Sequence, residues 1–284
     1  MRVAGRTVVV TGAGDGIGRE LVLGLLGRGA RVAAVSRSAE HLDETAERAG
    51  PAADRLTTHV ADVADREAVE ALPAQVVGTH GQVDGLVNCA GIIQPFVALV
   101  DLDYPQIERV MAVNFWGPVH TTKAFLPHLV ARPVAHLVNI SSMGGFLPVP
   151  GQTAYGASKA AVRLLTEGLH AELAGTSVAV TVVFPGAVRT GIVENSGVTA
   201  PEISGATARR LERSMTSASR AARIILDAVE RDAYRVTVGT DAAVMDVLAR
   251  LAPERAARLV RSRMNALLSS AARPVPPGSG APPR

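Results

Sequence analysis

The chain contains little of several residue types, and each shortage excludes a class of protein. Only one of its 284 residues is a cysteine, Cys89, so no disulfide can form within the chain. A chain without disulfides fits a reducing compartment, and we expect a cytoplasmic location. The neighbours Leu86, Val87 and Ala90 predict that Cys89 is a buried thiol at a strand end rather than a nucleophile. Aromatic residues amount to 3%, so aliphatic side chains must fill the core.

Long apolar runs and localised charge are also missing. The opening segment 1–6 lacks the apolar region and cleavage site of a signal peptide. No stretch of about twenty uncharged apolar residues predicts a membrane span. The formal net charge is +3, but the arginines are dispersed and not interleaved with aromatics, which argues against a nucleic-acid partner. With 48% hydrophobic residues the chain can bury a sizeable core.

Short apolar runs alternate with helical patterns along most of the chain, which is typical of a parallel sheet flanked by helices. We therefore expect an α/β fold: a Rossmann-type doubly wound parallel sheet of about seven strands, with helices on both faces. It forms one domain over residues 1–240. The predicted strands span 7–10, 31–35, 56–60, 85–88, 134–140, 178–184 and 234–238. The predicted helices span 16–26, 66–77, 107–130, 153–173 and 219–230, and a Gly-, Thr- and Ser-rich loop or lid spans 186–214.

The C-terminal part has a different character. Residues 241–272 keep a helical apolar period and are predicted to form a helical extension, while the Pro-rich residues 273–284 are predicted to be a disordered tail. One face of the extension carries several arginines. Its apolar side is expected to dock on the domain or on a second subunit. A basic amphipathic helix can also lie on a membrane surface, which is the alternative.

A glycine-rich loop follows the first predicted strand and opens the first predicted helix, the context that a phosphate-binding loop requires. Gly12 permits a tight turn, Gly16 allows close approach of a pyrophosphate, and Gly18 lets the helix pack closely. Backbone amides and the helix dipole would hold the anion. The sequence therefore predicts a dinucleotide site with contacts from Gly12, Gly14, Asp15, Gly16, Ile17 and Gly18.

A second group of residues predicts acid–base chemistry. Tyr155 and Lys159 are at helical i, i+4 spacing, with Ser142 upstream, and Lys159 is one of only two lysines, the other being Lys123. Side chains at this spacing share a helix face. An ammonium beside the phenol would favour tyrosinate and lower a pKa that starts near ~10. We expect a proton donor, its electrostatic partner and a hydroxyl around one reacting oxygen.

These motifs occur in one order along residues 5–240. After Thr-Gly-x-x-x-Gly-x-Gly come Asp62-Val63, Asn88-x-Ala90-Gly91, Asn114, Ser142, Tyr155-x-x-x-Lys159, Pro185-Gly186 and Thr190. In this the sequence resembles the short-chain dehydrogenase/reductase (SDR) family. The resemblance implies an NAD(P)-dependent oxidoreductase that acts on CH–OH groups and their carbonyl partners.

The resemblance also implies roles for individual residues. The catalytic residues would be Asn114, Ser142, Tyr155 and Lys159, with Tyr155 as general acid/base and Asn114 positioning a water. Further cofactor contacts would come from Asp62, Val63, Asn88, Ala90, Gly91, Pro185, Gly186, Val188 and Thr190, besides Tyr155 and Lys159. No residue is assigned to a metal. Relatives commonly pair through helices equivalent to 107–130 and 153–173, which implies a homodimer or homotetramer.

The end of the second predicted strand bears on the choice of cofactor. An acid there would bind the ribose 2′-hydroxyl of NAD, whereas an arginine accepts the 2′-phosphate of NADP. The chain has Ser36 and Arg37 and no acid, which favours NADP(H), with NAD possible. Arg37 as a solvated surface residue is the alternative. Asp15 argues the other way, because NADP-preferring relatives often place a base at that position.

The segments predicted to surround the substrate are apolar, so we expect a lipid-like, steroid-like or aliphatic carbonyl or alcohol. The alternative for these side chains is that they fill the core. They are Ile92, Ile93, Phe96, Met143, Phe146, Leu147 and Val188. Two other functions stay open at this point. One is a catalytically silent dinucleotide-binding sensor, and the other is a membrane-peripheral reductase held by the C-terminal helices.

Overall fold

Seven parallel strands form the central sheet of the computed structural model, which describes residues 1–199, 212–213 and 215–268. The predicted tail 273–284 and part of the predicted loop 186–214 lie outside the described residues. The strand order is β3-β2-β1-β4-β5-β6-β9, and every neighbouring pair is parallel. The strands are β1 Thr7–Thr11, β2 Arg31–Ser36, β3 Leu56–Val60, β4 Gly85–Asn88, β5 Ala135–Ile140, β6 Val178–Pro185 and β9 Arg235–Val238. The predicted fold class is confirmed.

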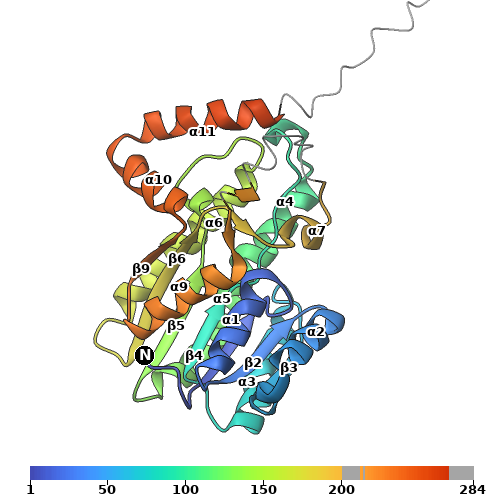
Figure 1. Ribbon diagram of the computed structural model, residues 1–284, viewed down its shortest axis with the longest axis vertical. Coiled ribbons are helices and arrows are strands. Elements are labelled where there is room, and N and C mark those ends of the chain that lie inside the picture. Colours follow the sequence, from blue (N-terminus) through green and yellow to red (C-terminus); the bar gives the residue numbers. More distant parts are fainter. Residues whose placement is uncertain (200–211, 214, 269–284) are drawn as a thin grey trace, which may run out of the picture.

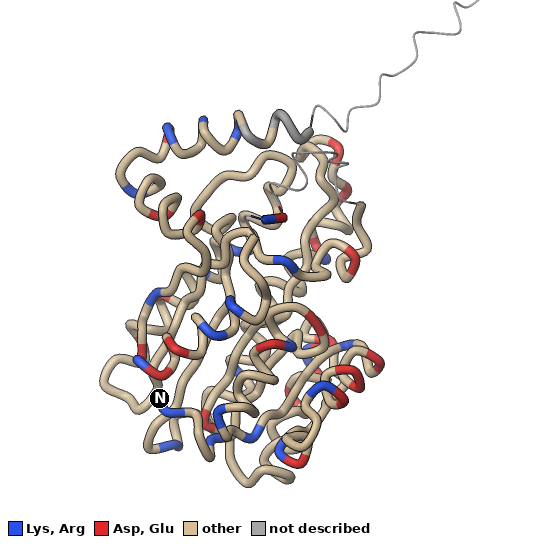
Figure 2. The backbone as a smooth tube through the Cα atoms, in the orientation of Figure 1, with Lys and Arg blue, Asp and Glu red and all other residues tan. Residues whose placement is uncertain are grey.

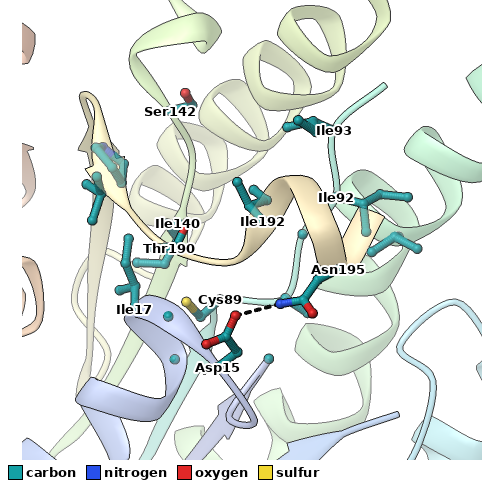
Figure 3. Close-up of a pocket in the computed structure, with 18 of the residues that line it drawn as sticks. Asp15, Ile17, Cys89, Ile92, Ile93, Ile140, Ser142, Thr190, Ile192 and Asn195 are labelled. Carbon is teal, nitrogen blue, oxygen red and sulfur yellow. Dashed lines mark hydrogen bonds between the residues drawn. The ribbon is translucent and has the colours of Figure 1, made fainter. Parts of the chain in front are cut away.

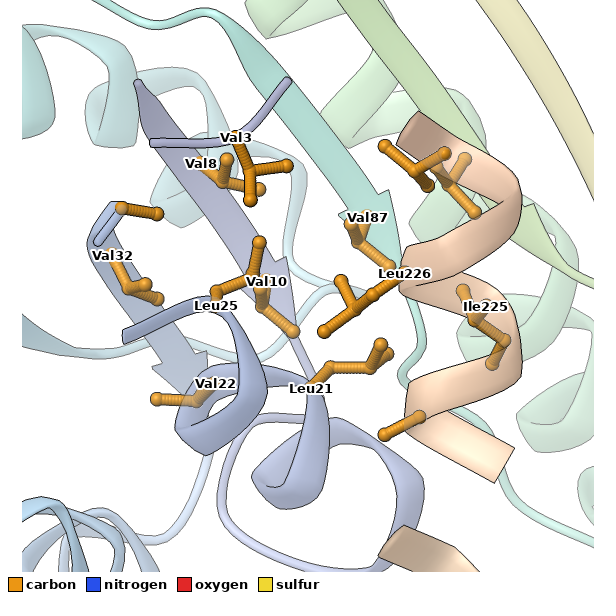
Figure 4. Packing of buried hydrophobic residues seen from close by; sticks show 14 of the residues in the cluster. Val3, Val8, Val10, Leu21, Val22, Leu25, Val32, Val87, Ile225 and Leu226 are labelled. Atoms are coloured by element: carbon orange, nitrogen blue, oxygen red, sulfur yellow. The ribbon is translucent and has the colours of Figure 1, made fainter. Parts of the chain in front are cut away.

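Helices cover both faces of the sheet (Figure 1). On one face, α1 (Gly16–Gly27) packs beside α9 (Ala218–Glu230), and Leu21 and Leu25 meet Ile225 and Leu226 over the strands (Figure 4). Three helices pack against the opposite face of the sheet: α3 (Arg66–His80), α5 (Gly117–Val130) and α6 (Thr153–Glu172). β1 and β6 are largely apolar without alternation because both of their faces are buried.

Two regions differ from the sequence prediction. A helix α2 (Ala39–Ala49) follows β2 and was not predicted, because only Leu42 and Thr45 of it are buried. Ser38 caps it by accepting a hydrogen bond from the His41 amide at 3.2 Å. The predicted helix 107–130 is interrupted: α4 (Tyr104–Met111) and α5 are joined by a π-helical turn, Ala112–Trp116.

The predicted loop contains short regular elements. These are β7 (Val188–Arg189), which pairs with β8 (Thr216–Ser217), and α7 (Ile192–Ser196). Among the residues that the structure describes, 3-10 turns also occur at Gly50–Arg55, Leu99–Asp101 and Met143–Gly145.

The C-terminal extension forms two helices, α10 (Thr240–Leu251) and α11 (Pro253–Leu268). Their apolar sides bury Met245 and Ala256 against Leu147, so the extension docks on the domain as expected. Arg255, Arg258 and Arg261 of α11 are exposed, and basic residues recur along this helix (Figure 2). No helix among the described residues combines the length and hydropathy that crossing a membrane requires.

β1 is the point where the strand order reverses, because β2 and β4 lie on its two sides. In open α/β sheets, ligands bind at the carboxyl ends of the strands beside such a reversal. The glycine loop after β1 and the segment after β4 both begin at this edge. The topology therefore places the predicted motifs around one crevice.

Candidate active site

A cavity of about 770 Å³ opens at the carboxyl ends of the strands, within the usual size of a small-molecule site. It brings together residues from the glycine loop, the ends of β2 to β6, the start of α6 and the segment that contains α7 (Figure 3). Every catalytic or cofactor-binding residue predicted from the sequence lines it except Asn88 and Asn114. Lining residues that the sequence did not single out include His41, Gln152, Ile192, Glu194 and Asn195.

The glycine loop has a backbone that side chains would disrupt. Gly12 and Gly16 have φ values of 67° and 52°, a region that favours glycine. A Cβ on Gly12 would lie 2.8 Å from the Ala90 Cα, and a Cβ on Gly16 would lie 3.0 Å from that of Thr190. α1 begins at Gly16 without a side-chain cap at Asp15. This leaves backbone amides at the helix start, which suits a phosphate group.

The short helix α7 is tied to both sides of the cavity. The Asn195 side-chain amide donates to Asp15 at 2.6 Å (Figure 3), and Arg37 donates to the Asn195 carbonyl at 2.8 Å. On the other side, the Ile93 amide donates to Ser196 Oγ at 2.9 Å. Asp15 and Arg37 were predicted as cofactor contacts, and the structure adds that both hold α7. The sequence carries no signal for Asn195, because the pairing joins residues far apart in the chain.

Tyr155 lies in the first turn of α6 and lines the cavity. Its ring is partly buried against Val63 and Ile92. Burial raises the pKa of the Tyr155 hydroxyl, and a hydrogen bond with Ser142 acts in the opposite direction. This differs from the prediction that Lys159 lowers that pKa. The phenol is therefore protonated at neutral pH, which is the form that can donate a proton.

Lys159 is 4% exposed, and its Nζ donates to the Ile140 carbonyl at 3.0 Å. Burial lowers the pKa of its ammonium group to about 8, with Cys89 acting in the opposite direction. The Lys159 ammonium therefore donates a hydrogen bond to the last residue of β5 and has little contact with solvent. Burial and Ser142, not Lys159, are the causes of the shift in the pKa of Tyr155.

Cys89 also lines the cavity. Burial raises the pKa of its thiol to about 12, with Lys159 acting in the opposite direction. The thiolate is the nucleophilic form, and the raised pKa keeps Cys89 as a thiol at neutral pH. Its side chain is only partly buried, whereas its sequence context predicted a buried one.

Asn114 lies in the π-helical turn and is fully buried. Its Oδ1 accepts from the Ile92 amide, and its Nδ2 donates to the Ile92 carbonyl, both at 2.9 Å, and to Ser158 Oγ at 3.0 Å. A Cβ on Gly91 would lie 3.3 Å from Asn114 Oδ1 and 3.2 Å from Lys159 Nζ. Asn114 and Lys159 therefore both lie close to Gly91, in the segment after β4. π-turns are frequent at functional sites.

Asn88 faces away from the cavity. Its Nδ2 donates to Asn139 Oδ1 at 2.8 Å, and its Oδ1 accepts from Thr121 at 2.6 Å. Asn139 in turn donates to Thr166 at 2.9 Å. The side chain thus joins the ends of β4 and β5 to the helices beneath, while the following residues Cys89, Ala90 and Gly91 line the cavity.

The apolar residues predicted around the substrate separate into two groups. Ile92, Ile93, Phe96, Met143 and Val188 line the cavity. Phe146 and Leu147 do not: Phe146 packs edge-on against Phe184 at 5.4 Å, and Leu147 is buried beneath α10 and α11. For these two, the alternative that they fill the core is correct.

Comparison with known proteins places this site in a family. The family model described as short chain dehydrogenase matches residues 6–200. The oxidoreductase SadH of Mycobacterium tuberculosis is 40% identical over 261 residues, which cover 90% of this chain and 94% of that protein. The chain belongs to the short-chain dehydrogenase/reductase family.

Solved structures agree with this assignment. A short-chain dehydrogenase/reductase of Burkholderia phymatum in complex with NAD superposes with a TM-score of 0.77 at 26% identity, covering 98% of this chain and 99% of that one. A short-chain dehydrogenase of Burkholderia cenocepacia in complex with NADP gives 0.75 at 27% identity, covering 92% and 99%. The two neighbours thus carry different dinucleotides.

Proposed function

We propose that this chain is an NAD(P)(H)-dependent oxidoreductase that transfers a hydride between nicotinamide and a carbonyl/secondary alcohol pair. The observation that carries the proposal is that Tyr155, Ser142 and Lys159 line the same cavity as the glycine loop. Residues 1–240 form the catalytic domain in this proposal, and residues 241–272 its helical extension.

The residues present fit a dinucleotide. A side chain at Gly12 or Gly16 would fill the cradle between the loop, Ala90 and Thr190. The amides at the start of α1 would hold the phosphates. Asp62 and Val63 would adjoin the adenine, and Pro185, Gly186 and Thr190 the nicotinamide end.

A bound nicotinamide supplies the hydride for the carbonyl carbon. Tyr155 donates its hydroxyl proton to the carbonyl oxygen, and Ser142 hydrogen-bonds the same oxygen as negative charge develops there. Lys159 does not shift the pKa of the neutral Tyr155 phenol in the structure. In this proposal its ammonium, protonated below about pH 8, acts on the tyrosinate only after the proton has left. Asn114 holds the segment after β4 against Lys159, and its predicted water-positioning role belongs to this proposal.

Arg37 bears on cofactor preference, and we propose NADP(H). Arg37→Ala is expected to weaken NADPH binding by roughly 10- to 100-fold, because an arginine–phosphate hydrogen bond is lost. NADH binding should change much less. Cofactor fluorescence titrations of both dinucleotides measure this. Arg109→Ala, at an exposed position of α4, is the control. Since Arg37 also holds α7, the ratio of the two affinities is decisive, and an unchanged ratio contradicts the assignment.

The substrate in this proposal is an apolar carbonyl or alcohol, because Ile92, Phe96 and Met143 line the cavity beside Tyr155. The test is an activity screen of the purified protein with NADPH and NADH against aliphatic, steroid-like and lipid-like ketones and alcohols. Consumption of cofactor with one substrate class supports the proposal. Tight cofactor binding without turnover across the panel would instead indicate a sensor.

We also propose a homodimer or homotetramer that pairs through α5 and α6, as relatives commonly do. Trp116 and Leu164 are 51% and 70% exposed on this side of the molecule. Analytical ultracentrifugation of the full chain measures the state directly. A monomer at micromolar concentration would contradict this part of the proposal.

A further inference from the structure

Gln94 clamps the start of α6 from a distant part of the chain. It is fully buried, and its Oε1 accepts from the Ala154 amide at 2.7 Å and the Tyr155 amide at 3.0 Å. Its Nε2 donates to the Gly151 carbonyl at 3.1 Å. In return, the Gln152 side chain donates to the Gln94 carbonyl at 2.9 Å. Four hydrogen bonds therefore join the segment after β4 to the first turn of α6 and to the two residues that precede its start at Thr153.

The helix needs this partner because its own sequence provides none. The first amides of an α-helix have no partner within the helix, and a Ser, Thr, Asp or Asn at the N-cap usually accepts from them. α6 begins after Gln152, whose side chain makes no capping bond. Gln94 takes that role from 60 residues away, and one of the two amides it holds belongs to Tyr155.

The same segment also holds other parts of the site. The Ile92 amide donates a hydrogen bond to Asn114 Oδ1, and the Ile93 amide donates one to Ser196 Oγ of α7. Gln94, the next residue of this segment, accepts hydrogen bonds from the first amides of α6, the helix that carries Tyr155. The segment thus sets the position of Tyr155 relative to Asn114 and α7, and Gln94 is its link to Tyr155.

We propose that Gln94 is a positioning residue for proton transfer: it holds the backbone of Tyr155 so that the phenol hydroxyl meets the substrate oxygen. This inference rests on the proposed function of Tyr155. It assigns Gln94 no contact with the substrate.

Gln94→Met tests it, because methionine has a similar shape but cannot accept from the two amides. We expect kcat for carbonyl reduction to fall at least about tenfold, since small displacements of catalytic groups are costly. The Kd for NADPH should stay within about twofold. Activity is expressed per cofactor-binding site, so that loss of folded protein does not count as loss of rate. Gln75→Met, at an exposed glutamine of α3, is the control. An unchanged kcat per site would overturn the proposal.

A pair of milder variants keeps the test decisive if Gln94→Met does not fold. Gln94→Glu keeps an acceptor at the same reach and, when protonated, also a donor to the Gly151 carbonyl. Gln94→Asn withdraws the amide by one methylene. We expect Gln94→Glu to be at least about fivefold more active than Gln94→Asn, with the advantage growing as pH falls. Equal activities at all pH values would contradict the proposal.

Hydrogen exchange separates this inference from the proposed function. In the wild-type chain, the amides of Ala154 and Tyr155 should be protected, and Gln94→Met should lose protection in peptides covering 151–158 but not in those covering 117–130. A wild-type protein without turnover, but with this exchange pattern, would refute the oxidoreductase proposal and leave the clamp intact. Unchanged exchange in Gln94→Met would refute the clamp itself.

Discussion

Tyr155→Phe is expected to lower kcat for carbonyl reduction by roughly 10²- to 10⁴-fold, the usual contribution of a positioned general acid. The substitution removes only the hydroxyl that donates the proton. The ring keeps its packing against Val63 and Ile92. Steady-state kinetics with NADPH and the best carbonyl from the screen measure the loss, and cofactor titration should give a Kd within about twofold of wild type.

The chain offers a matched control for this variant. Tyr104 is 81% exposed at the start of α4, and Tyr104→Phe removes a hydroxyl outside the cavity. Its kcat should equal that of the wild-type protein. Near-wild-type activity in Tyr155→Phe would reject Tyr155 as the acid, whatever the cofactor affinity.

Lys159→Met is expected to cost about 10²-fold or more in kcat, because no cation then stabilises the developing tyrosinate. In the wild-type protein, carbonyl reduction should decline as pH rises through about 8, where the buried ammonium loses its proton. The pH profile of kcat measures this decline. Lys123→Met is the control, since Lys123 is the other lysine of the chain and lies exposed on α5. Retention of full activity by Lys159→Met would contradict the assignment.

Lys159→Met, which is expected to lower kcat, should raise the free energy of unfolding at neutral pH. Burial lowers the pKa of Lys159 from 10.5 to about 8. Between these values the unfolded chain binds more protons than the folded one, so stability rises with pH across this window. The charged amine therefore costs the folded state up to about 3 kcal/mol at pH 7. Urea unfolding at pH 7 and pH 10 should show this rise in the wild-type protein and a smaller one in Lys159→Met.

The central strands could be predicted because a strand that is buried on both faces consists of a short, continuous run of apolar residues. Val8, Val9 and Val10 are apolar without alternation and form the centre of β1, with β2 and β4 on its two sides. The glycine loop could be predicted because Gly12 and Gly16 occupy backbone conformations that favour glycine. Local constraints of this kind leave local signals.

Other features depend on contacts between residues far apart in the chain, which a local sequence pattern does not predict. α2 was missed because it buries little, and the π-helical turn Ala112–Trp116 was missed because it lies within a stretch that was predicted as one continuous helix. The prediction for the Tyr155 pKa failed for a related reason. Helical spacing placed Lys159 on the right face, but its hydrogen bond to the Ile140 carbonyl and the burial of both groups depend on how α6 lies against the sheet.

The amino-acid order alone therefore determined the fold class, the glycine loop and the identity of the residues around Tyr155, because each follows from backbone conformation, periodicity or motif spacing. The tertiary structure decided which of those residues reach the cavity, that Asn88 turns away from it, and that Asn195 holds Asp15 and Arg37 together. It also decided how α6, the helix that carries Tyr155, is capped. A helix start without its own capping side chain must take a partner from elsewhere in the fold, and only the packing of α6 beside the segment after β4 shows that this partner is Gln94.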